Sequence, residues 1–104
     1  MEFFAEKEVL AVNFGGTEII GKFSSISKDE VLDTSFVILK DAVMILTQMT
    51  DKGLAHNMLS VTENGNFSDE IVVGVRNISF VRRVSPLGDL YRKYIQITTK
   101  LVVP

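Results

Sequence analysis

The chain has 104 residues, of which 46% are hydrophobic and 23% are charged, a composition that favours a single compact domain over residues 1–104 and excludes a disordered tail. The formal net charge of −2 excludes attraction of nucleic acid by the overall charge, so any RNA site must be local. The lack of cysteine in the sequence excludes disulfides, thiolate zinc sites and a cysteine nucleophile.

The amino-terminal third lacks the pattern of a targeting segment and predicts a hairpin. The first residues are acidic and contain no long apolar run, so we expect a soluble, cytoplasmic protein that does not bind a membrane. Val9 to Phe14 predicts a strand that ends at Gly15-Gly16, a dipeptide suited to a hairpin turn. The return strand is expected over Thr17 to Ile26. Gly21 in its middle predicts a sharp bend or a close approach of backbone, as in a small barrel.

The middle of the chain predicts a polar loop and one long strand. Ser27 to Ser35 is polar and mixed in character, and we expect a loop there. Phe36 to Met49 is the longest apolar run and carries hydrophobic residues on both faces, which favours a bent strand that is covered on both sides. Asp51-Lys52-Gly53 then predicts a tight turn.

The remaining strands are expected in shorter pieces. Ala55 to Glu63 is predicted to pair back onto the long strand, before a turn at Asn64-Gly65-Asn66. Two short strands over Ile71 to Val75 and Ile78 to Val84, or one strand kinked near Gly74, complete a barrel that spans about residues 9–84.

An amphipathic helix is expected at the carboxyl end, over about residues 86–99. Ser85 can cap it, and Pro86 is tolerated in a first helical turn. The helix is expected to lie on the barrel with one apolar face. The apolar residues at helical spacing are Leu87, Leu90, Tyr91, Tyr94, Ile95 and Leu101.

Side chains that could carry out catalysis are few. His56 is the only histidine, so no catalytic or metal-binding imidazole pair can form, and we expect an ordinary strand or turn residue. The carboxylates of Asp29, Glu30 and Asp33 lack the spacing of a calcium loop, and no serine lies in a Gly-x-Ser-x-Gly pattern. We therefore expect no enzyme, metal ion, cofactor or small-molecule substrate.

Positive charge is concentrated in the last third of the chain. A basic strand and helix there would suit RNA phosphate or an acidic patch on a neighbouring copy, and the two alternatives stay open. The residues are Arg76, Arg82, Arg83, Arg92, Lys93 and Lys100.

Two stretches of the chain resemble the Sm and Sm-like family, in the style of its divergent phage or marine microbial members. The first comprises Leu10-Ala11-Val12, Gly16 to Phe23 and the more specific Val37-Ile38-Leu39-Lys40-Asp41-Ala42-Val43. The second comprises Val73 to Ile78, followed by Ser79-Phe80-Val81. Together they cover most of residues 9–84.

The resemblance implies an all-β fold, a small and strongly bent five-stranded antiparallel barrel, here with a carboxyl-terminal helix. It also implies a homo-oligomeric ring of about five to eight copies, closed through edge strands four and five so that no strand edge stays open. Strand four would lie in Ala55 to Glu63 and could resume at Ile71 to Val73, and strand five would lie in Ile78 to Val84. Phe80, Ile78 and Met58 are the residues expected at or near the seam between copies.

The family binds single-stranded RNA around the pore of such a ring, and the resemblance implies Arg76, Asn77 and Lys28 as the residues that contact nucleotide. The chain departs from the family's RNA-binding pattern at two places, and it places its helix at the carboxyl end where the family usually has one before strand one. Its loop after strand two begins at Ser27 without the usual Asp followed by Asn, and the usual Arg-Gly pair falls on Gly74-Val75. These departures favour the alternative of a structural or assembly ring that binds protein partners and no nucleic acid.

Overall fold

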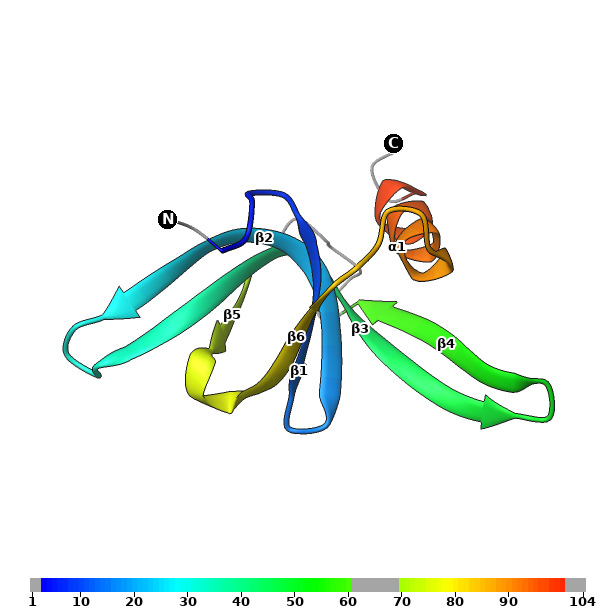
Figure 1. Ribbon diagram of the computed structural model, residues 1–104, viewed down its shortest axis with the longest axis horizontal. Helices are drawn as coiled ribbons and strands as arrows, with labels where there is room; N and C mark the ends of the chain where they lie inside the picture. The colour runs from blue at the N-terminus through cyan, green and yellow to red at the C-terminus, as the bar shows by residue number, and fades with distance from the viewer. Residues whose placement is uncertain (1–2, 61–69, 101–104) are drawn as a thin grey trace.

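The computed structural model describes residues 3–60 and 70–100 of the chain (Figure 1). Six strands, one short 3₁₀ turn and one helix follow in order. They are β1 (Val9–Phe14), β2 (Thr17–Asp29), β3 (Thr34–Thr50), β4 (Gly53–Ser60), β5 (Glu70–Gly74), η2 (Val75–Asn77), β6 (Ile78–Arg83) and α1 (Asp89–Lys100).

The strands form one antiparallel sheet in the order β4-β3-β2-β1-β6, with β5 also paired to β3. The long strand β3 serves two partners, because β5 pairs with residues 36–40 and β4 with residues 43–50. The predicted fourth strand is therefore present in two pieces. The sheet is strongly curled into a half-barrel with one carboxyl-terminal helix, which confirms the predicted fold class.

The curl depends on a close contact at the centre of β2 and β3. A Cβ atom on Gly21 would lie 3.1 Å from the Cβ of Leu39 and 3.2 Å from the carbonyl oxygen of Lys40, so any other residue would force these neighbours to move. On β3 the extra residue of a bulge is Asp41, which has a φ of 52°. The predicted close approach at Gly21 is thus confirmed.

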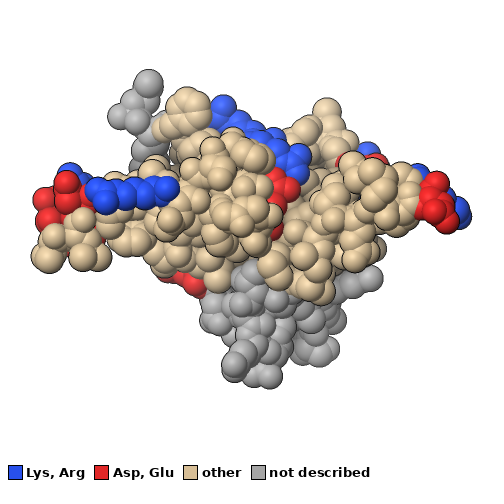
Figure 2. All heavy atoms as spheres, turned by 90° about the horizontal axis from the view of Figure 1, so that it is seen from below, with Lys and Arg blue, Asp and Glu red and all other residues tan. Residues whose placement is uncertain are grey.

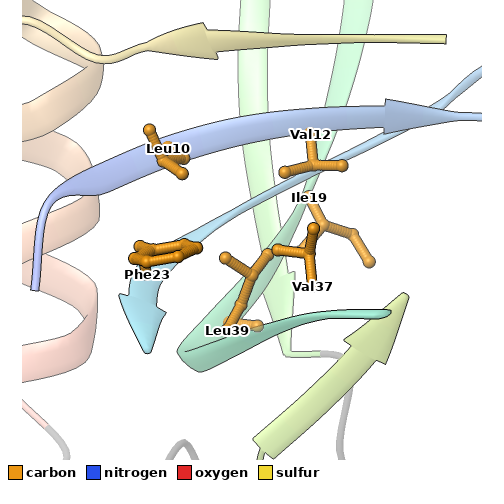
Figure 3. Packing of buried hydrophobic residues seen from close by; sticks show 7 residues of the cluster. Leu10, Val12, Ile19, Phe23, Val37 and Leu39 are labelled. Carbon is orange, nitrogen blue, oxygen red and sulfur yellow. The ribbon is translucent and has the colours of Figure 1, made fainter. Parts of the chain in front are cut away.

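Hydrophobic side chains pack on both faces of the sheet. The concave face holds one cluster of buried residues, which Figure 3 shows converging between the strands: Leu10, Val12, Ile19, Phe23, Val37, Leu39 and Ala42. Helix α1 covers part of the other face, where Tyr94 is fully buried against a second cluster of Val9, Ile20, Val43 and Ile45. The prediction that the helix lies on the barrel holds.

The observed connections between strands match the predictions from the sequence at three places and differ from them at one. Gly15 and Gly16 form the β1–β2 turn with positive φ, Gly53 has a φ of 110° at the β3–β4 turn, and η2 separates β5 from β6. The predicted loop over Ser27 to Ser35 is wrong, because β2 continues to Asp29 and β3 already begins at Thr34. The predicted turn at Asn64-Gly65-Asn66 and the residues 61–63 lie outside the described part of the chain.

The hairpin replaces the loop because Asp29 closes a tight turn. Its Oδ1 accepts hydrogen bonds from the backbone N–H groups of Val31 at 2.9 Å and Leu32 at 3.1 Å. A polar run can therefore carry paired strands almost to its tip.

The helix begins three residues later than Pro86 suggests. The Oγ of Ser85 accepts a hydrogen bond from the N–H of Leu87, and the N–H of Gly88 donates to the carbonyl of Ser85 at 3.0 Å. Ser85 thus closes a turn, and α1 starts at Asp89. In the described ranges, 3–60 and 70–100, the chain has no helix with the length and apolar character needed to cross a membrane.

Candidate nucleic-acid interface

Arg76 and Asn77 lie together in the 3₁₀ turn η2, which joins β5 to β6. All three residues of this turn are exposed. A Cβ on Gly74 would lie 3.3 Å from Nδ2 of Asn77, so glycine lets the amide of Asn77 fold back over the end of β5. The turn therefore presents a guanidinium and an amide from consecutive residues at the surface.

The tip of the β2–β3 hairpin meets this turn. Nη2 of Arg76 donates a hydrogen bond to the carbonyl oxygen of Asp33 at 3.2 Å, and Nζ of Lys28 lies 3.4 Å from Oδ1 of the same residue. Asp33 has a φ of 49°, which turns its carbonyl and carboxylate toward different partners. The fold thus brings Arg76, Asn77 and Lys28, the three residues expected to contact RNA, into one neighbourhood.

An aromatic side chain that the sequence did not single out lies beside them. Phe36 stands opposite Gly74 in the β3–β5 register, and its ring lies 3.8 Å from the position a Cβ on Gly74 would take. It is half-buried. The signal in the sequence was its place as the first aromatic residue after a polar segment, but its approach to η2 depends on the pairing of distant strands.

The charge around this site is mixed. Asp29, Glu30 and Asp33 supply three carboxylates at the hairpin tip, against the two cations of Lys28 and Arg76. Figure 2 shows acidic and basic side chains crowded together at this end of the molecule. The arrangement offers hydrogen-bond donors to phosphate oxygens and base edges, with a local charge close to neutral.

The three residues expected at a seam between copies lie in different surroundings. Phe80 is 52% exposed and projects from β6. Ile78 packs against the cluster on the concave face, and Met58 packs against the cluster beneath α1. Only Phe80 of the three therefore offers a large free surface. Val72 on β5, which was not expected there, is 58% exposed.

Three strands leave one edge open. In the part of the chain that the structure describes, β4 and β5 each pair only with β3, and β6 pairs only with β1. An open edge presents unpaired backbone N–H and C=O groups.

Strand β6 is fixed to the sheet by side chains as well as by its backbone. Arg82 reaches across β1 to Glu18 on β2 through two hydrogen bonds of 2.9 Å, and these raise the pKa of the Arg82 guanidinium. Nε of Arg83 lies 2.8 Å from Glu8, and its guanidinium stacks over the rings of Phe3 and Phe4. The guanidinium groups of Arg82 and Arg83 on β6 are thus already engaged by contacts within the same chain.

The remaining candidate for chemistry is His56. Its Nδ1 lies 3.0 Å from Oγ1 of Thr47, the residue opposite it in the β3–β4 register. Over residues 3–60 and 70–100, no group of three His, Cys, Asp or Glu side chains is placed to hold a metal ion.

Comparison of the chain with protein-family models, with curated proteins and with solved structures found no match.

Proposed function

We propose that this chain is a non-catalytic Sm-like protein whose identical copies assemble into a closed ring that binds single-stranded RNA around its pore. The observation that carries the proposal is the meeting of η2 with the β2–β3 hairpin tip, directly between the open edges of β5 and β6. The alternative, a ring that only assembles protein partners, shares the first half of this proposal.

The seam is proposed to form when β6 of one copy adds to β5 of the next. The two strands have similar lengths, six and five residues, and each exposes a large apolar side chain, Phe80 and Val72. Pairing them covers this apolar surface and satisfies the backbone groups of both edges. Repeated around a closed circle, it leaves none of these edges open.

Such a seam would repeat the candidate site around the axis. Because η2 connects β5 to β6 within each copy, every β5–β6 seam has an η2 turn at its end. Arg76 and Asn77 of successive copies would then form a circle of donors. A strand of RNA could contact several copies in turn, which multiplies weak single contacts.

Each site has the parts that suit an unpaired nucleotide. The ring of Phe36 can stack on a base, the amide of Asn77 can read a base edge, and Arg76 and Lys28 can reach phosphate. Arg76 must leave the carbonyl of Asp33 to do so. We therefore expect modest affinity for each nucleotide and a clear dependence on salt.

The protein-scaffold alternative is favoured by the carboxylates of the hairpin tip. Asp29, Glu30 and Asp33 outnumber the cations beside them, and the chain as a whole has a net charge of −2. A basic segment of another protein would suit this end better than a phosphate backbone does.

Assembly is tested by light scattering on a sizing column. The wild-type protein should have a mass several times 11.6 kDa. Phe80→Asp should give the monomer, because a carboxylate would be buried in each seam. Leu87→Asp is the matched control, since Leu87 is 86% exposed and lies outside the strands, and it should keep the wild-type mass. A monomeric wild type would remove the ring.

RNA binding is tested by titration of labelled oligo-U and oligo-A at two salt concentrations. We expect Arg76→Gln to weaken binding about tenfold, which corresponds to ~1.4 kcal/mol. Arg92→Gln should change little, because Arg92 lies on α1 beside Asp89. Affinity should fall as salt rises, since phosphate contacts release counterions. A ring that binds neither oligonucleotide at low salt would leave only the scaffold alternative.

A further inference from the structure

A hollow of about 310 Å³ lies at the bend of the sheet, and three lysines line it. Lys7 comes from the turn before β1, Lys22 from β2 and Lys40 from β3. We propose that this hollow binds a phosphate group. The site is separate from η2 and does not depend on the proposed ring.

The first observation is a pair of like charges. Lys22 and Lys40 stand directly opposite each other in the β2–β3 register, so their side chains lie on the same face of the sheet. Like charges in this arrangement destabilise a sheet. An anion placed between the two ammonium groups would convert this repulsion into attraction.

The second observation is how the neighbouring carboxylates are distributed among the three cations. Nζ of Lys22 lies 3.2 Å from Asp41, and Nζ of Lys40 lies 3.8 Å from Glu70. Lys7 takes part in none of the ion pairs found over residues 3–60 and 70–100. The three lysines are thus matched by the three carboxylates of Glu6, Asp41 and Glu70, and Lys7 is the cation that these ion pairs leave for an incoming anion.

The third observation is the backbone. Among the described residues, three other than glycine have positive φ, and two of them line this hollow: Lys7 at 70° and Asp41 at 52°. Such conformations cost free energy and are found preferentially at functional sites. The turn is held in place because the N–H of Lys7 donates to the carbonyl of Phe23 at 2.8 Å, and the N–H of Phe23 donates to the carbonyl of Glu8 at 2.8 Å.

The fourth observation is a hydroxyl on the wall. The β2–β3 register shifts between Phe23 and Ser25, and Ser24 at this irregularity lines the hollow. Bulges of this kind change the direction of a side chain and are common beside binding sites. Ammonium groups and a hydroxyl are donors that a phosphate accepts well.

The ligand chemistry that fits is a phosphate group with at least one accessible face. The volume lies at the lower end of the range for small-molecule sites, roughly 300 to 1,000 Å³. The group could be inorganic phosphate or the terminal phosphate of a nucleotide. The two sources share the same contacts with the lysines and differ in what lies outside the hollow.

Isothermal titration calorimetry of the full chain at constant ionic strength tests the site, with inorganic phosphate, uridine monophosphate and uridine as separate ligands. We expect saturable heat with phosphate and with the nucleotide, and none with uridine. Lys7→Gln and Lys40→Gln should each weaken binding about tenfold. Lys52→Gln, the same change at the exposed β3–β4 turn, should bind as the wild type does.

A second measurement locates the ligand without substitutions. Saturating phosphate should slow the acetylation of Lys7, Lys22 and Lys40, read by mass spectrometry, and leave Lys52 unchanged. Tighter binding of the nucleotide than of phosphate would identify a nucleotide as the source. No saturable heat, or equal binding by Lys7→Gln and Lys52→Gln, would overturn the proposal. The size of the particle in solution affects neither outcome, so failure of the ring and failure of this site are distinguishable.

Discussion

Gly21 is the residue at which the curvature of the sheet depends on the lack of a side chain. Its position in the middle of an apolar strand was a readable signal, since glycine weakens a flat strand and permits close approach. The bulge on β3 that faces Gly21 could not be predicted from the sequence. Asp41 forms the bulge on the opposite strand, and nothing local distinguishes an aspartate that adopts positive φ from one on a solvated surface.

We predict that Gly21→Ala destabilises the protein by about 1–3 kcal/mol, because the new methyl group would press on Leu39 and on the backbone of Lys40. Urea unfolding followed by circular dichroism, at one fixed protein concentration, measures the change. Gly88→Ala is the control, since the nearest atom to its Cβ would be the carbonyl oxygen of Ser85 at 3.5 Å. Equal effects of the two substitutions would contradict this account of the bend.

Phe36 shows the same limit at the candidate site. Arg76, Asn77 and Lys28 were identified through a resemblance in the sequence, and the fold brings them into one neighbourhood. Phe36 was not identified, because its ring reaches η2 only through the pairing of β3 with β5. A residue whose role depends on pairing with a distant strand cannot be recognised from the residues next to it in the sequence.

At the scale of elements, a partly buried hydrogen bond joins helix α1 to the sheet. The hydroxyl of Tyr94 donates a hydrogen bond to the carbonyl of Asp41 at 2.7 Å, so the helix is tied to the bulge of β3. The amphipathic spacing predicted the helix and its buried face. The first residue of the helix could not be predicted, because it depends on the turn that Ser85 closes before Asp89. The β2–β3 hairpin was missed for a similar reason, since a polar segment does not reveal whether its backbone is paired.

We predict that Tyr94→Phe lowers the free energy of unfolding by about 1–2 kcal/mol at neutral pH, because the carbonyl of Asp41 would lose its partner. Burial, and after it the charge of Asp41, raises the pKa of Tyr94 above the ordinary value of 10.0. The wild-type advantage is therefore fully present below pH 10 and should shrink as the pH rises above it, since only the unfolded chain then releases this proton.

The measurement is urea unfolding of wild type and Tyr94→Phe at several pH values between 7 and roughly 11, read as a difference so that the lysines cancel. Parallel curves for the two proteins over the whole range would show that Tyr94 does not contribute in this way.

At the scale of the whole molecule, the proposed ring makes thermal stability depend on concentration. If copies complete each other's edges, mass action should raise the melting temperature of the wild type as the protein concentration increases. Phe80→Asp should melt at a lower temperature that does not change with concentration. Differential scanning calorimetry over a hundredfold range of concentration measures both, and a constant wild-type melting temperature would argue against assembly.

In the proposed ring, the bridge from Arg82 to Glu18 would affect how fast two copies join and how much free energy joining costs. Strand β6 lies at the edge of the sheet, and Arg82 ties it across β1 to Glu18 on β2, so β6 has lost its conformational freedom before any second chain is met. In the proposed ring, docking would then not need to order β6, so less of the binding free energy would be consumed by entropy, and a rigid strand would meet its partner in a single alignment.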